Sequence, residues 1–152
     1  MTTTPDYVAE NERELSRMRE IVERLSDDEL GRQVNDSWTV AGVLGHIAFW
    51  DGRALALADK LVRGLPFSSS DDEPEDVDWI NDASRPLILA IPPAEAAALS
   101  LRISDETDAR MASLPPDLIA RSWPADPTSP LNALRAGHRA EHLDEIEASL
   151  QG

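Results

Sequence analysis

The chain has 152 residues, a formal net charge of −15 at pH 7 and no cysteine. A surface this negative repels nucleic-acid phosphates and anionic membranes, so we expect neither nucleic acid nor a membrane as a partner. Without cysteine there are no disulfides, no thiolate metal ligands and no thiol nucleophile from the protein itself. The longest apolar run is too short to span a bilayer, and the polar, acidic beginning does not resemble a secretory signal. We therefore expect a cytoplasmic protein.

The length predicts one domain over residues 1–152, with enough chain to bury a core. A first amphipathic helix is predicted from about residue 5 to residue 25. Its apolar stripe consists of Val8, Leu15, Met18, Val22 and Leu25. Apolar residues at three- and four-residue spacing are the signature of one buried helix face.

The second predicted helix has the strongest pattern. Thr39 is a suitable N-cap, and Gly64 followed by Pro66 ends the helix. Its apolar stripe consists of Val40, Val43, Ile47, Trp50, Ala54, Leu57 and Leu61. A polar, acidic stretch then predicts a long exposed connection.

Prolines delimit the remaining predicted helices. A short helix over residues 77–84 is expected to stop before Pro86. Pro93 opens a third long helix, along which we expect Ala97, Leu101, Ser104, Ala109 and Met111 to face the core. The last helix is predicted to begin after Ser129, with Pro130 at its first position. With no convincing strand pattern, the sequence predicts an all-α four-helix bundle with a long connection between helices two and three.

The chain has three histidines, and their positions suggest a metal site. His138 and His142 are one helical turn apart, so they point the same way. His46 lies beside the apolar stripe of the second helix, so all three imidazoles can point into the bundle. Three histidines leave a coordination position open, which is typical of catalytic metal sites. Imidazole ligands suit zinc, nickel, iron or copper.

Three glycines, Gly42, Gly45 and Gly137, lie within four residues of a histidine. Each costs about 1 kcal/mol in a helix relative to alanine. Close helix approach, room for a ligand beside the metal, or simple tolerance would each explain them.

The segment "HRAEH" also matches the inverted zinc-protease motif, with Glu141 as general base. That class is expected to have its third ligand well downstream of His142, where only a short segment follows. The metal-site interpretation is therefore preferred. Glu141 then has three open roles: a fourth ligand, a hydrogen-bond partner of a ligand, or a surface charge.

The segments "SWTVAGVLGHIAFWDGRAL" and "SWPADPTSPLNALRAGHRAEHLDEI" resemble the DinB/YfiT-like metalloprotein superfamily. The first resembles its Trp-Thr/Ser-Val helix with a histidine, and the second its closing H-x-x-x-H segment. The resemblance implies a DinB-like four-helix bundle, often a homodimer, with a divalent metal on His46, His138 and His142. Some members are thiol-dependent enzymes, including mycothiol-dependent maleylpyruvate isomerases and bacillithiol S-transferases.

The leading hypothesis is a metal-dependent transferase or isomerase that uses a low-molecular-weight thiol and a small-molecule substrate. Zinc or nickel is the expected metal, with iron as a further choice. Trp50, one turn beyond His46, is expected either to line the site or to belong to the core. The alternatives are a metal-dependent hydrolase, with bound water in place of the thiol, and a non-catalytic metal-binding or stress-associated protein.

Overall fold

The computed structural model describes residues 6–151. The long helices of this range are α1 (Asp6–Arg24), α3 (Val40–Val62), α5 (Pro93–Ala112) and α7 (Ala136–Leu150). The short ones are α2 (Asp27–Leu30), η1 (Ser69–Asp71), α4 (Asp78–Leu89) and α6 (Pro116–Ala120). Residues 6–151 contain two isolated β-bridges and no strand, which confirms the predicted all-α bundle. None of the described helices combines the length and apolar character that a membrane crossing needs.

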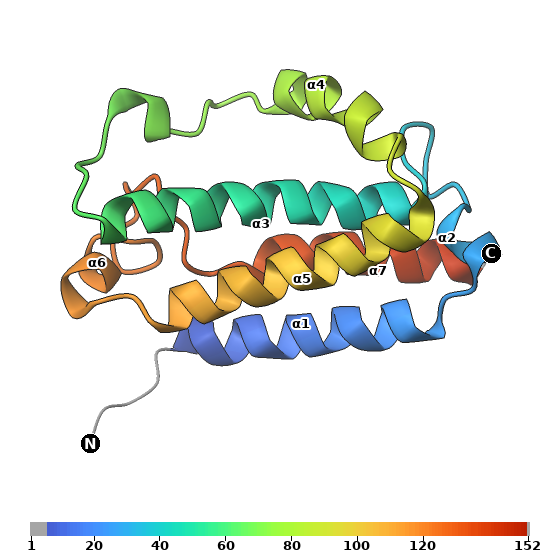
Figure 1. The fold of residues 1–152 in the computed structure, drawn as a ribbon, viewed down its shortest axis with the longest axis horizontal. Helices are drawn as coiled ribbons and strands as arrows, with labels where there is room; N and C mark the ends of the chain where they lie inside the picture. The colour runs from blue at the N-terminus through green and yellow to red at the C-terminus, as the bar shows by residue number, and fades with distance from the viewer. Residues whose placement is uncertain (1–5, 152) are drawn as a thin grey trace.

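The long helices run in two directions (Figure 1). α1 and α7 run one way along the bundle, and α3 and α5 run the other way. The chain between α3 and α5 returns along the outside of α3, with α4 in its second half, so α5 can start beside the beginning of α3. The predicted long connection is therefore a crossover. α3 packs against both α5 and α7.

α3 begins and ends as the sequence predicts. The Thr39 hydroxyl accepts a hydrogen bond from the Gly42 amide at 2.9 Å, which satisfies one of the free N–H groups of the first turn. Beyond the last turn Gly64 has a φ of 88°, a left-handed conformation that favours glycine. Every residue of the predicted apolar stripe of α3 is buried.

The prediction that the short helix stops before Pro86 is wrong, because α4 continues to Leu89. A proline inside a helix removes a backbone hydrogen bond and is normally destabilising. Here the turn after Pro86 packs closely on α3. A Cβ added to Gly45 would lie 2.6 Å from Cγ2 of Ile88, and one added to Gly42 would lie 2.8 Å from Cδ2 of Leu89. This packing offsets the loss at Pro86.

The same distances decide between the explanations for the glycines. Gly42 and Gly45 permit the close approach of α4 to α3. A Cβ on Gly137 would have no atom within 4 Å, so glycine is only tolerated there.

The predicted start of the last helix is also wrong. α7 begins at Ala136, and residues 131–133 pair instead with the backbone of Trp123. The side-chain oxygen of Asn11, on α1, accepts hydrogen bonds from the amides of Arg135 and Ala136 at 2.7 and 2.9 Å. α7 is therefore capped by a residue more than 120 positions away in the sequence.

The core consists of two apolar clusters with a polar layer between them. One cluster contains Leu15, Met18, Val43, Ile47 and Leu143, and the other contains Tyr7, Leu57, Met111 and Leu131. The buried polar residues of the layer are Asn11, Asp51, Ser104, Thr107, Asp108, Arg135 and Arg139. α5 contributes polar residues to the core, and Ala109, which was predicted to face inward, is exposed.

Alanine substitutions at Gly45 and Gly137 form a matched pair. We expect Gly45→Ala to lower the free energy of unfolding by about 1–3 kcal/mol, because its methyl group overlaps Ile88. Gly137→Ala should raise it by up to about 1 kcal/mol, because alanine is the better helix former and the space is open. Urea unfolding of both variants tests this, and equal effects would contradict the close packing of α4 on α3.

Candidate metal centre

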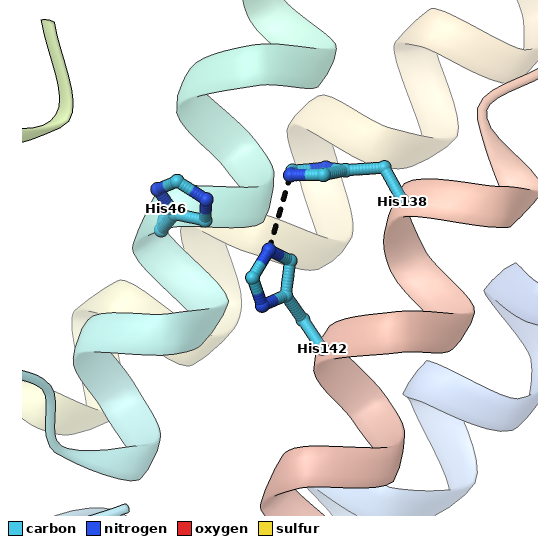
Figure 2. Close-up of side chains that lie close together, drawn as sticks. All are labelled: His46, His138 and His142. Atoms are coloured by element: carbon cyan, nitrogen blue, oxygen red, sulfur yellow. Dashed lines mark hydrogen bonds between the residues drawn. The ribbon is translucent and has the colours of Figure 1, made fainter. Parts of the chain in front are cut away.

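The structure brings together the three histidines that the sequence singles out. His46 extends from the first half of α3, and His138 and His142 extend from the first two turns of α7 (Figure 2). Because α3 and α7 are antiparallel neighbours, the rings meet between them. Each ring offers one nitrogen, and these nitrogens lie within 4.8 Å of one another.

The rings on α7 have the spacing of two ligands on one ion. The Nε2 atoms of His138 and His142 are 3.1 Å apart. Two nitrogens bound tetrahedrally to zinc at 2.0–2.1 Å would be about 3.3 Å apart. Nδ1 of His142 lies 3.2 Å from Oε2 of Glu145 and donates a hydrogen bond to this carboxylate oxygen. With its proton on Nδ1, His142 carries a lone pair on Nε2, which faces Nε2 of His138 (Figure 2). Metal-ligating histidines are commonly held in this way, by a hydrogen bond from the other ring nitrogen.

The protonation state of the cluster suits a cation. Burial, followed by the neighbouring His142, lowers the pKa of His46 to about 4. Burial, followed by His142 and His46, lowers the pKa of His138 to about 3. Both rings are therefore neutral at pH 7, and their lone pairs can bind a metal. Nδ1 of each ring is buried without a hydrogen-bond partner among the described residues. An all-nitrogen donor set, with His46 buried and the other two histidines half-buried, fits a divalent ion of borderline softness.

A cavity of about 380 Å³ opens beside the histidines. Its wall includes the three histidines together with Trp50, Arg53, Glu73, Asn81, Asn132, Arg135 and Glu141. The cavity gives a small molecule access to the centre.

Two residues with open roles in the sequence line this cavity. Trp50 is buried with the core residues and also lines the cavity, so both of its expected roles apply. Its Nε1 donates to Oδ1 of Asn81, another residue of the cavity wall, at 2.9 Å. Glu141 is exposed, so it lies on the open side of the cavity. Its carboxylate does not belong to the converging group of ligand atoms that the described residues form.

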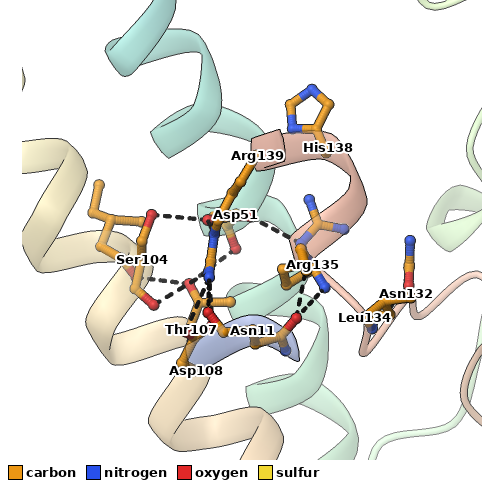
Figure 3. A network of polar contacts seen from close by, with 12 residues as sticks. Asn11, Asp51, Ser104, Thr107, Asp108, Asn132, Leu134, Arg135, His138 and Arg139 are labelled. Carbon is orange, nitrogen blue, oxygen red and sulfur yellow. Dashed lines mark hydrogen bonds and ion pairs between the residues drawn. The ribbon is translucent and has the colours of Figure 1, made fainter. Parts of the chain in front are cut away.

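A buried ion-pair network next to the histidines has no counterpart in the sequence predictions (Figure 3). The Asp51 carboxylate, which is 0% exposed, accepts from Nε of Arg135 at 2.9 Å and from Nε of Arg139 at 2.8 Å. Ser104 donates to the same carboxylate at 2.8 Å. Arg139 also forms a two-pronged ion pair with Asp108, at 2.7 and 2.9 Å.

The network joins the two helices that carry the histidines. Asp51 lies five positions after His46 on α3, and the two arginines lie on either side of His138. One sequence signal for it exists: Arg139 occurs at core spacing from Leu143, which makes it a charged residue on the buried face of α7. No local pattern shows that Asp51 is its partner.

The two carboxylates of the network, Asp51 and Asp108, have pKa values shifted in opposite directions. Burial alone would raise the pKa of Asp51, but the charges of Arg139 and Arg135 and the hydrogen bonds to it outweigh burial and lower its pKa. For Asp108 burial is the largest effect, and it raises the pKa despite the opposing Arg139. Asp51 is therefore the carboxylate whose charge stabilises the fold.

We predict that Asp51→Asn lowers the free energy of unfolding by about 3–5 kcal/mol, because it leaves buried arginine charge uncompensated. Asp108→Asn should have a clearly smaller effect, because burial opposes that charge. Urea unfolding at neutral pH measures both.

The same substitution has a defined pH dependence. The pKa of Asp51 in the folded protein lies below its ordinary value of 3.8. The contribution of its charge to the free energy of unfolding is therefore fully present at pH values above 3.8. The difference between wild type and Asp51→Asn should therefore shrink as the pH falls through the folded pKa. A difference that grew on acidification would contradict this assignment.

Comparison with known proteins places the chain in a family. The family model described as the DinB superfamily matches residues 10–146, a range that includes all three histidines and the polar layer. Searches of curated proteins and of solved structures gave no match. The match covers most of the chain, and this protein therefore belongs to the DinB superfamily.

Proposed function

We propose that His46, His138 and His142 bind one divalent metal ion and that the protein is a metal-dependent transferase or isomerase using a low-molecular-weight thiol. Zinc or nickel is the preferred metal, and iron is the next choice. The observation that carries the proposal is the convergence of three imidazoles, two of them neutral by their lowered pKa, on a cavity open to small molecules.

The donor set supports an incomplete coordination sphere. Three protein ligands are typical of catalytic sites, whereas structural zinc sites have four. Among residues 6–151 no carboxylate joins the converging nitrogens. When bound, a divalent cation lowers the pKa of a coordinating thiol, so that the nucleophilic thiolate exists at neutral pH.

The thiol has to come from outside the protein, because the chain has no cysteine. The cavity, at about 380 Å³, is within the usual size range of small-molecule sites. Trp50, fixed by its hydrogen bond to Asn81, provides a rigid aromatic wall. Asn132 and the arginines of the wall offer hydrogen bonds that orient a polar ligand. Thiol-dependent isomerases and transferases occur among the proteins that the sequence resembles.

Two other functions use the same centre and have different requirements. A hydrolase would use water at the open position and would not respond to thiols. A non-catalytic metal-binding protein would have a filled coordination sphere, for which Glu141 is the obvious fourth ligand. The position of Glu141 on the open side of the cavity favours a catalytic centre over this last function.

We predict that cobalt(II)-loaded protein develops a thiolate-to-cobalt charge-transfer absorption when mercaptoethanol is added. His142→Gln should lose both the visible cobalt spectrum and the thiol response, because it removes a ligand. Glu141→Gln is the control, because it changes a neighbouring charge outside the nitrogen cluster, and it should keep both.

The outcomes separate the three functions. A cobalt spectrum that does not respond to thiol, together with hydrolysis of activated esters, would identify a hydrolase. A spectrum that changes in Glu141→Gln and never responds to a ligand would identify a filled, non-catalytic site.

A further inference from the structure

Arg135 is a buried cation whose outer nitrogens have no hydrogen-bond partner among the described residues. The residue is 7% exposed, and its Nε donates to Asp51 at 2.9 Å. Its two terminal nitrogens make no hydrogen bond to any residue in the range 6–151, and they turn away from Asp51 (Figure 3). Arg135 lines the cavity together with His138 and His142. Its unpaired donors therefore face the ligand side of the network.

The neighbouring Arg139 shows how unusual this is. Arg139 is 0% exposed, and its nitrogens donate to Asp51, to Asp108 and to the backbone oxygens of Asn11 and Ser104. Buried polar groups are nearly always hydrogen-bonded. The terminal nitrogens of Arg135 are not among the fully buried unpaired atoms of the described residues, because they reach the cavity that Arg135 lines. All three guanidinium nitrogens of Arg139 are hydrogen-bonded within the protein, whereas two of the three of Arg135 remain available to a ligand in the cavity.

A second cation lines the same cavity. Nη2 of Arg53 donates to the backbone oxygen of Asp71 at 2.7 Å, and its guanidinium lies 5.9 Å from the ring centre of Trp50. The Asp71 carboxylate is paired with Lys60 and not with Arg53. Within residues 6–151 Arg53 therefore has only the backbone oxygen of Asp71 as a hydrogen-bond partner and forms no ion pair.

Acidic and basic side chains occupy different parts of the cavity wall. The cavity's acidic side chains, Glu73 and Glu141, are exposed and lie on its open side. Arg135 lies in the buried wall, next to the N-terminal end of α7, whose dipole adds positive potential. The buried wall of the cavity therefore presents guanidinium donors, whereas the protein as a whole is strongly anionic.

We propose that Arg135, assisted by Arg53, forms a carboxylate-binding subsite beside the histidine centre, and that the ligand is a small molecule carrying a carboxylate. The planar guanidinium presents paired donors that match the two oxygens of a carboxylate. The inference deepens the proposed function and rests on it for the reaction. The carboxylate belongs either to the substrate or to the thiol, and both make the same contact.

The test compares carboxylates with their uncharged amides by isothermal titration calorimetry. Succinate and succinamide are titrated into metal-free protein, and mercaptopropionate and mercaptopropionamide into cobalt-loaded protein. We expect at least one carboxylate to bind about tenfold or more tightly than its amide, as for a charged hydrogen bond. A preference for succinate assigns the subsite to the substrate, and one confined to mercaptopropionate assigns it to the thiol.

Variants locate the effect. Arg135→Gln should abolish the preference for the carboxylate, and Arg135→Lys should reduce it, because lysine keeps the charge opposite Asp51 but lacks the planar fork. Arg102→Gln, which removes an equal charge from an exposed position outside the cavity, should leave the preference unchanged. The amide comparison on the wild-type protein needs no variant, so it holds even if Arg135→Gln does not fold.

Equal binding of carboxylates and amides by the wild type would overturn the subsite, as would a preference retained in Arg135→Gln. These failures are distinct from failure of the proposed function. A protein that binds cobalt and thiol without preferring carboxylates lacks only the subsite. A protein that prefers succinate through Arg135 but binds no metal lacks only the metal centre.

Discussion

The sharing of the Asp51 carboxylate by Arg135 and Arg139 is the interaction on which the rest of the structure depends. It lies between two apolar clusters, where ion pairs are only weakly screened by water. Apolar contacts alone tolerate small rotations and shifts of one helix against another, whereas a buried carboxylate with two fixed donors does not. The network therefore sets the register of α7 against α3.

That register determines the geometry of the histidine centre. Asn11 fixes where α7 begins, and the arginines fix its rotation, so that His138 and His142 face His46 across the α3–α7 contact. The division of charge is equally important. The buried charges of Asp51, Arg135 and Arg139 lie in the polar layer, while burial lowers the pKa of His46 and of His138 and keeps these two rings neutral and ready for a cation. The ion-pair network thus holds the helices in register, and the neighbouring histidines provide the donors for a cation.

Much of the fold could be predicted from the sequence, because periodicity and caps are local signals. The α3 stripe, its Thr39 cap and the triad of histidines are all visible in this way. The start of α7 and the passage of α4 through Pro86 are not, because each depends on a contact with a distant helix. The Asp51 network was missed for the same reason: a sequence shows a charge at a core position but not the partner that compensates it.

The metal centre is tested most directly by elemental analysis of untagged protein purified without chelator, beside the His46→Ala/His138→Ala double variant. We expect about one equivalent of zinc, nickel or iron per chain in the wild type. We expect none in a double variant that keeps its helical circular dichroism. A folded wild-type protein that takes up no divalent metal even after reconstitution would show that the three histidines are not a metal site.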